Sequence, residues 1–177
     1  MSPTEASGSP KRMPPLRAPD LLRALHRHRV EFVVIGGFAL AAHSVARATK
    51  DLDIVPEPSK ANLRRLLAAL NELDAAPAAL EDFEPNEILE LTLENLELGG
   101  NWILRTSYGR LDVMQYVEGV RDFRRLREEA VKPEIEALNE PTLFAGRDDL
   151  IAMKTAAGRD QDLIDIDMLE RSRARED

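Results

Sequence analysis

The chain has 177 residues, of which 44% are hydrophobic and 32% are charged, a length and composition that suit one globular domain. Its net charge of −8 disfavours non-specific binding to nucleic acid, and the lack of cysteine excludes disulfides and thiolate metal sites. No apolar run approaches the ~20 residues of a membrane span, and the start lacks the apolar segment of a signal peptide, so we expect a cytoplasmic protein.

The N-terminal segment is rich in proline and serine, and we expect residues 1–19 to form a disordered arm. Residues 20–177 are expected to form a single domain. A short helix is predicted over 19–29, because leucines recur there at helical spacing after a Pro-Asp start signal.

The next elements place glycines and acids next to buried strands. The β-branched and aromatic run over 31–37 predicts a strand that ends in Gly36 and Gly37. Residues 38–46 are rich in alanine and predict a helix. The short run 51–55, stopped by proline, predicts a second strand.

An amphipathic helix is predicted over 59–73, with Ser59 as its N-cap. The stretch 81–100, which contains the acidic tract 81–97, fits either a strand or a helix. Residues 101–117 predict a hairpin that turns at "SYG", and 147–177 predict two helices that form a helical C-terminal part, with a bend near Gly158. Because the hairpin makes an all-parallel sheet improbable, the fold class is α+β, with a small mixed sheet and flanking helices.

Three acids lie in runs that otherwise build the core. Residues two apart in a strand point the same way, about 6.6 Å apart, so Asp51 and Asp53 share a face. Asp112 stands between Leu111 and Val113 in a second predicted strand. If these strands are neighbours, the three carboxylates form a cluster that suits Mg²⁺ or Mn²⁺, and such clusters serve in-line phosphoryl and nucleotidyl displacement.

The glycine pair adds a second part of a nucleotide site. A strand that ends in Gly-Gly and opens a helix lets a phosphate approach the bare backbone at the helix N-terminus. Asp-x-Asp alone is a weak signal, and the pairs Asp160/Asp162 and Asp165/Asp167 lie in a predicted helix, where positions i and i+2 do not share a face. The order of these features is more informative than any one of them: a strand, Gly-Gly, a helix, an Asp-x-Asp strand and then a third Asp in a strand.

The stretch "GGFALAAHSVARATKDLDIV" resembles the signature of the DNA polymerase β-type nucleotidyltransferase superfamily. More narrowly, "RATKDLD" and "DDLIAMKTAAGRDQDLIDIDML" resemble the minimal bacterial nucleotidyltransferases that include the AbiEii-like toxins. The resemblance implies a polymerase β-like fold. It also implies catalytic, metal-binding roles for Asp51, Asp53 and Asp112, with Asp112 as a candidate general base.

The same resemblance implies that the triphosphate binds at Gly36 and Gly37 and that Lys154 neutralises phosphate charge. For Lys154 the alternative is a salt bridge to Asp149, Asp160 or a neighbouring helix. Thr49 and Arg47 either support the metal-binding strand or touch phosphate, and for Arg47 a structural bond to Asp51 or to a helix end stays open. Arg159 and Asp162, three residues apart, are interpreted as a helix pair.

The function expected is a metal-dependent nucleotidyltransferase that moves a nucleoside monophosphate from an NTP onto an acceptor hydroxyl. The acceptor is a tRNA 3′ end, a protein or a small molecule. The resemblance raises the tRNA option and, with it, the toxin of a toxin–antitoxin pair with an antitoxin partner. The alternative is a catalytically idle module that binds nucleotides or a partner protein. A kinase-like phosphotransferase is disfavoured because no glycine-rich phosphate loop with a nearby lysine is present.

Overall fold

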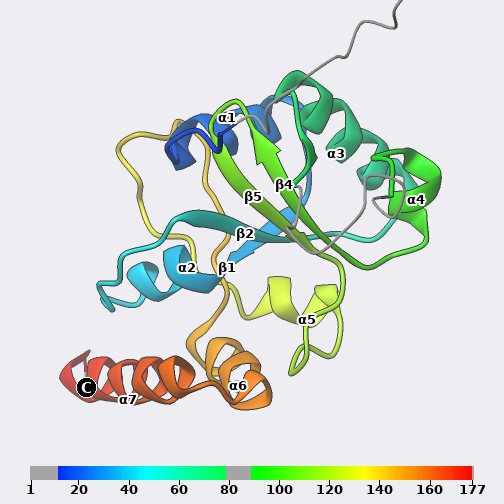
Figure 1. The fold of residues 1–177 in the computed structure, drawn as a ribbon. Helices are drawn as coiled ribbons and strands as arrows, with labels where there is room; N and C mark the ends of the chain where they lie inside the picture. Colours follow the sequence, from blue (N-terminus) through cyan, green and yellow to red (C-terminus); the bar gives the residue numbers. More distant parts are fainter. Residues whose placement is uncertain (1–11, 79–88, 177) are drawn as a thin grey trace, which may run out of the picture.

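A five-stranded sheet forms the centre of the protein in a computed structural model that describes residues 12–78 and 89–176 (Figure 1). The strands lie in the order β1-β2-β5-β4-β3. Their bounds are Phe32–Ile35 for β1, Asp51–Pro56 for β2, Ala76–Pro77 for β3, Asn101–Thr106 for β4 and Gly109–Met114 for β5.

The sheet is mixed. β2 and β5 run parallel, whereas the β1–β2, β4–β5 and β3–β4 pairs are antiparallel. The predicted hairpin is present as β4 and β5, with Thr106 opposite Gly109 at its turn. Because β5 returns through this hairpin, it can lie parallel to β2, which is distant in sequence. The mixed sheet and its helices confirm the α+β architecture.

One face of the sheet packs against α1 (Ala18–Arg27), α3 (Lys60–Glu72) and α4 (Leu93–Glu97) (Figure 1). As expected, α3 begins after Ser59, whose side chain accepts a hydrogen bond from the backbone N–H of Asn62. Leucines of α1 and α3 are fully buried here, together with Leu52 and Leu111 of the sheet. Much of the core therefore lies on this side of the central strands, and buried residues such as Leu40 and Leu150 extend it to the other side.

The opposite face carries α2 (Gly36–Ala42), α5 (Phe123–Glu128), α6 (Arg147–Ala157) and α7 (Asp160–Glu176) (Figure 1). The helical C-terminal part is present as α6 and α7. The bend between them lies at Gly158, which has φ +62° and caps α6 in the left-handed conformation. α6 packs against both α2 and α7, and it thereby brings the C-terminal part over the β1–α2 junction.

Several details differ from the sequence-based expectations. The helix after β1 begins at Gly36 itself, two residues earlier than predicted. Residues 12–17, part of the expected arm, are ordered: Leu16 packs on the core and the Arg17 guanidinium lies 5.1 Å from the Tyr108 ring centroid. Residues 1–11 of the arm and 81–88 of the acidic tract lie outside the described residues. Within the described ranges no helix is long and apolar enough to cross a membrane.

Candidate active site

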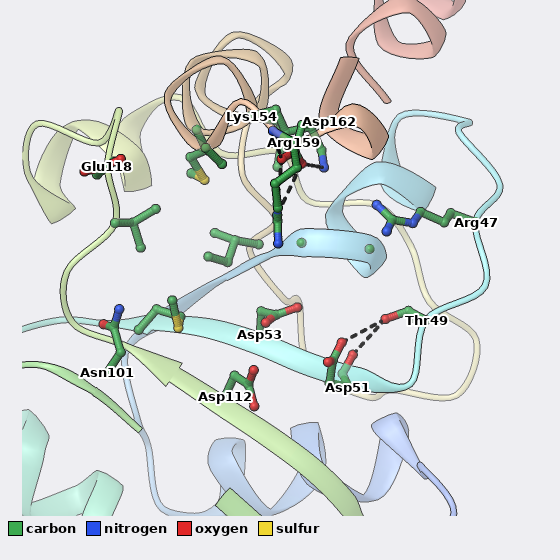
Figure 2. Close-up of a pocket in the computed structure, with 18 of the residues that line it drawn as sticks. Arg47, Thr49, Asp51, Asp53, Asn101, Asp112, Glu118, Lys154, Arg159 and Asp162 are labelled. Carbon is green, nitrogen blue, oxygen red and sulfur yellow. Dashed lines mark hydrogen bonds and ion pairs between the residues drawn. The ribbon is translucent and has the colours of Figure 1, made fainter. Parts of the chain in front are cut away.

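Strand β2 presents two carboxylates on the face opposite the core. Leu52 and Ile54 are fully buried, and the alternate residues Asp51 and Asp53 are half-buried. In Figure 2 both acids point toward α2 and α6, away from α1. The period of the strand therefore turns an apolar sequence into a two-sided element, with core on one side and acids on the other.

Strand β5 adds the third carboxylate beside them. Asp53 is the register partner of Asp112, and Asp51 is the partner of Arg110. Asp112 is buried, with 6% of the residue exposed. Because register partners on neighbouring strands project to the same side, the parallel pairing brings the three predicted catalytic acids onto one surface (Figure 2).

This arrangement raises the pKa of Asp53 to about 7. Burial is the largest cause, followed by the charges of Asp51 and Asp112, whereas Arg110 and Lys154 act in the opposite direction. A carboxyl group with so high a pKa lies where anionic charge lacks compensation. The site therefore favours an added cation.

The two glycines leave room for this strand. Gly36 has φ +66°, and a Cβ there would lie 2.2 Å from Asp53 Oδ2. A Cβ on Gly37 would lie 2.8 Å from Cβ of Thr49. The N-terminus of α2 has no side-chain cap from the described residues. The glycines thus allow the helix to begin in contact with the acidic strand and leave its first N–H groups without a side-chain partner.

Thr49 supports the strand directly. Its hydroxyl donates to the carbonyl oxygen of Asp51 at 3.0 Å and lies 3.3 Å from Asp51 Oδ1 (Figure 2). These contacts tie Thr49 to β2, and its role at the site stays a prediction.

Lys154 is buried and paired with two acids of α7. Its Nζ lies 2.6 Å from Asp165 Oδ2 and 3.3 Å from Asp162 Oδ1. Lys154 therefore forms a salt bridge to a neighbouring helix, which was one of its predicted alternatives. Its partners are Asp162 and Asp165, and not Asp149 or Asp160. Lys154 nevertheless lines the same cavity as the carboxylates.

Asp162 and Asp165 were not predicted as site residues, although Asp162 was expected to pair with Arg159, and both side chains are only 1% exposed. Positions i and i+3 of a helix share a face, so the two acids point together. Asp165 also pairs with Arg47, which is therefore not bonded to Asp51. Arg159 Nε donates to Asp162 Oδ2 at 2.7 Å. Two buried acids thus hold three cations, which we call the cationic clamp: Lys154, Arg47 and Arg159.

Burial alone would raise the pKa of Asp162, but hydrogen bonds from Arg159 and Lys154 outweigh it, and the pKa is lowered. The anionic form is therefore the stable one. The three cations of the clamp outnumber the two carboxylates that hold them, which leaves one net positive charge. This excess faces the cavity opposite Asp53 in Figure 2, where it can meet an anionic ligand.

Arg110 is a further residue of the site that was not predicted from the sequence. Its Nε donates to Asp112 Oδ1 at 2.8 Å and its Nη2 donates to Asp112 Oδ2 at 2.7 Å. Nε also lies 3.6 Å from Asp51 Oδ2. The strand period that paired Asp51 with Asp53 applies equally to Arg110 and Asp112, so this contact was visible in principle.

These groups surround one cavity of about 830 Å³, a size typical of ligand sites. All eight residues predicted for the site line it. Its other walls come from α6, from the end of β5 and from the segment after β5, including Met114, Val117, Glu118 and Met153. The roles of the eight predicted residues in binding and catalysis stay predictions.

The donor chemistry fits a hard divalent cation, because three carboxylates converge and the pKa of Asp53 reports uncompensated anionic charge. However, across the described residues no three acidic or histidine side chains are arranged as an ion-binding group. Both oxygens of Asp112 are engaged by Arg110. Metal binding at the three acids therefore requires the contact between Asp112 and Arg110 to open.

His43 is a structural residue. It is buried, with 7% of the residue exposed, and its Nε2 lies 2.8 Å from the carbonyl oxygen of Ala145. This contact ties the end of α2 to the segment that precedes α6.

A family model described as "Nucleotidyltransferase of unknown function (DUF6036)" matches residues 20–171. A search of curated proteins finds no match. Among solved structures, the crystal structure of ANT(2″)-Ia in complex with adenylyl-2″-tobramycin is similar, with a TM-score of 0.55 over 88% of this chain and 87% of that chain. Its sequence identity of 13% limits the likeness to the fold.

Proposed function

Because the chain belongs to this nucleotidyltransferase family, its residues 20–171 being matched, we propose that it transfers a nucleoside monophosphate from an NTP to an acceptor hydroxyl in a reaction that depends on a divalent metal. The observation that carries the proposal is the register of β2 and β5. It places Asp112 beside Asp53, on the side of the sheet that faces Gly36, Gly37 and the cationic clamp.

Asp51, Asp53 and Asp112 would hold Mg²⁺ or Mn²⁺. A bound divalent ion would lower the charge repulsion at the reacting phosphate and stabilise the negative charge that develops there. The raised pKa of Asp53 supports this role, because a cation favours the ionised carboxylate.

The triphosphate would lie between the N-terminus of α2 and the clamp. Gly36 and Gly37 supply backbone that a phosphate can approach closely, and Lys154, Arg159 and Arg47 supply positive charge. Their anchoring on Asp162 and Asp165 keeps these cations in place before the substrate arrives, which lowers the cost of ordering them.

The chemical step would be an in-line substitution at the α-phosphorus. The acceptor oxygen forms the new bond to phosphorus, the bond to the bridging oxygen breaks, and pyrophosphate leaves. The hydroxyl proton would pass to Asp112 as the general base. Positioning and charge neutralisation are the main contributions that the protein makes to such a transfer.

For the acceptor, the resemblance of "RATKDLD" and the C-terminal block to AbiEii-like toxins supports a tRNA 3′ end, and with it a cytoplasmic toxin with an antitoxin partner. A protein hydroxyl and a small molecule are the competing acceptors. The net charge of −8 favours a small footprint on RNA, limited to the end that enters the cavity.

The test is incubation of the full chain with each α-³²P-labelled NTP, Mg²⁺ or Mn²⁺, total RNA and cell lysate. The fraction that becomes labelled identifies the acceptor class, and the active NTP identifies the donor. Asp53→Asn is the inactive control. Asp167→Asn, an exposed acid paired with Arg171 on α7, is the matched active control. Absence of transfer in every fraction, or equal transfer by Asp53→Asn, would refute the proposal.

A further inference from the structure

Asp112, the third predicted metal ligand, is already bound by Arg110. Both side chains come from β5, two residues apart, and therefore project from the same face. The guanidinium uses two N–H groups, one to each carboxylate oxygen, at 2.8 and 2.7 Å. This fork-like geometry is the strongest form of arginine–carboxylate pairing. Arg110 is thus the internal partner that satisfies Asp112 in the metal-free protein.

Arg110 also affects the other two acids. Its Nε lies 3.6 Å from Asp51 Oδ2, and its register position is opposite Asp51 on β2. The side chain is 36% exposed, whereas that of Asp112 is 9% exposed, so the guanidinium has a path toward solvent and the carboxylate does not. Of the two partners, Arg110 is the one that can move.

A divalent ion at these acids would compete with the guanidinium for the same oxygens. It would also be repelled by the guanidinium, because like charges a few ångströms apart interact strongly in a partly buried site. An NTP changes this balance, because its phosphates bring negative charge and offer Arg110 a new partner. Metal alone and metal with nucleotide should therefore differ in their ability to release Asp112.

We propose that Arg110 is a positioning residue that holds Asp112 in the metal-free enzyme and competes with the metal for it, so that the site fills when metal and NTP arrive together. This inference rests on the proposed function, since it assumes that the three acids bind a divalent ion. It adds an order to the reaction: the guanidinium leaves Asp112 before that carboxylate can act.

The chain offers a matched control. Arg105 on β4 is the antiparallel register partner of Arg110, so its side chain projects to the same face of the sheet. In the part of the chain that the structure describes, the Arg105 side chain makes no hydrogen bond or ion pair. Removing its charge therefore changes the field near the acids without freeing Asp112.

The experiment measures Mn²⁺ binding by electron paramagnetic resonance and calorimetry, for the full chain, without nucleotide and with a non-hydrolysable NTP analogue. Arg110→Met removes the charge and the donors but keeps much of the side-chain length. Without nucleotide, it should tighten Mn²⁺ binding by at least about tenfold, whereas Arg105→Met should change it by less than about threefold. With the analogue, the difference between wild type and Arg110→Met should shrink.

Arg110→Lys keeps a charge but cannot donate to both oxygens of Asp112. Its Mn²⁺ affinity should lie between those of the wild type and Arg110→Met. Melting curves establish that each variant is folded. If Arg110→Met binds Mn²⁺ as the wild type does, or more weakly, the competition is wrong while the metal site stands. If no form binds Mn²⁺, even with the analogue, the metal assignment in the proposed function fails and the competition fails with it.

Discussion

Asp53 lies directly opposite Asp112 on the neighbouring parallel strand, and burial together with the charges of Asp51 and Asp112 raises the pKa of Asp53 to about 7. Burial and these neighbouring charges thus oppose the ionisation of the acid at the centre of the site. The same pairing that assembles the candidate active site therefore makes the metal-free protein sensitive to pH.

The sign of that sensitivity follows from linkage. Between the ordinary pKa of 3.8 and about 7, folded Asp53 keeps a proton that the unfolded chain has released. The free energy of unfolding therefore falls as pH rises through this window. In urea titrations of the metal-free protein at pH 5 and pH 8, Asp53→Asn should gain stability relative to wild type at pH 8. Asp167→Asn should show no such gain, and parallel curves for all three proteins would contradict the prediction.

Gly36→Ala should damage both the fold and the site, because a Cβ there would lie 2.2 Å from Asp53 Oδ2 at φ +66°. We expect a loss of at least about 1–3 kcal/mol in the free energy of unfolding and a large loss of transfer activity. Gly99→Ala is the control: Gly99 also has positive φ (+81°), but its Cβ would meet nothing within 4 Å. Equal effects of the two variants would assign the loss to backbone strain alone.

Asp165→Asn should destabilise the protein, because it removes the charge that partners buried Lys154 and Arg47. Breaking one side of a buried ion pair costs about 3–5 kcal/mol. Chemical denaturation measures the loss, with the exposed Asp167→Asn as the reference. A change of less than about 1 kcal/mol would show that the clamp contributes little to folding.

Arg159→Met should separate binding from stability. The Arg159 side chain is 75% exposed, so its pair with Asp162 contributes little to folding, but it lines the cavity beside Lys154. We expect the KM for the NTP to rise by about tenfold or more, with a melting temperature close to wild type. Arg171, which lies on α7 and pairs with exposed Asp167, provides the control: Arg171→Met should leave KM unchanged. An unchanged KM for Arg159→Met would remove Arg159 from the nucleotide site.

The strand-borne acids could be predicted because their information is local. A period of two in an apolar run, as in residues 51–55, gives the face on which each acid lies. The same rule places Arg110 and Asp112 on one face, so their contact also has a local signal in the sequence. The small elements β3 and α5 have only two and six residues, and they were not separated from the surrounding loops.

The cationic clamp could not be predicted in full. Asp162 and Asp165 share a helix face because they are three residues apart. The Asp-x-Asp pairs that contain them, 160/162 and 165/167, do not share a face and so drew no prediction. Their pairing with Lys154 depends on the bend at Gly158, which folds α7 back onto α6. Arg47 lies 118 residues from Asp165 in the chain, and a single sequence carries no local signal for such a contact.

The parallel pairing of β2 with β5 also bears on when the site forms. A long crossover that holds α3, β3, α4 and β4 separates Asp53 from Asp112 in the chain. Bringing the two residues together therefore carries the loop-closure entropy cost of a contact between distant residues. Such non-local pairings form late in folding, after local helices and hairpins. On a ribosome, the strand that carries Asp112 emerges only after all of these elements. A nascent or truncated chain that ends before β5 can therefore fold locally and yet carry no complete acidic site.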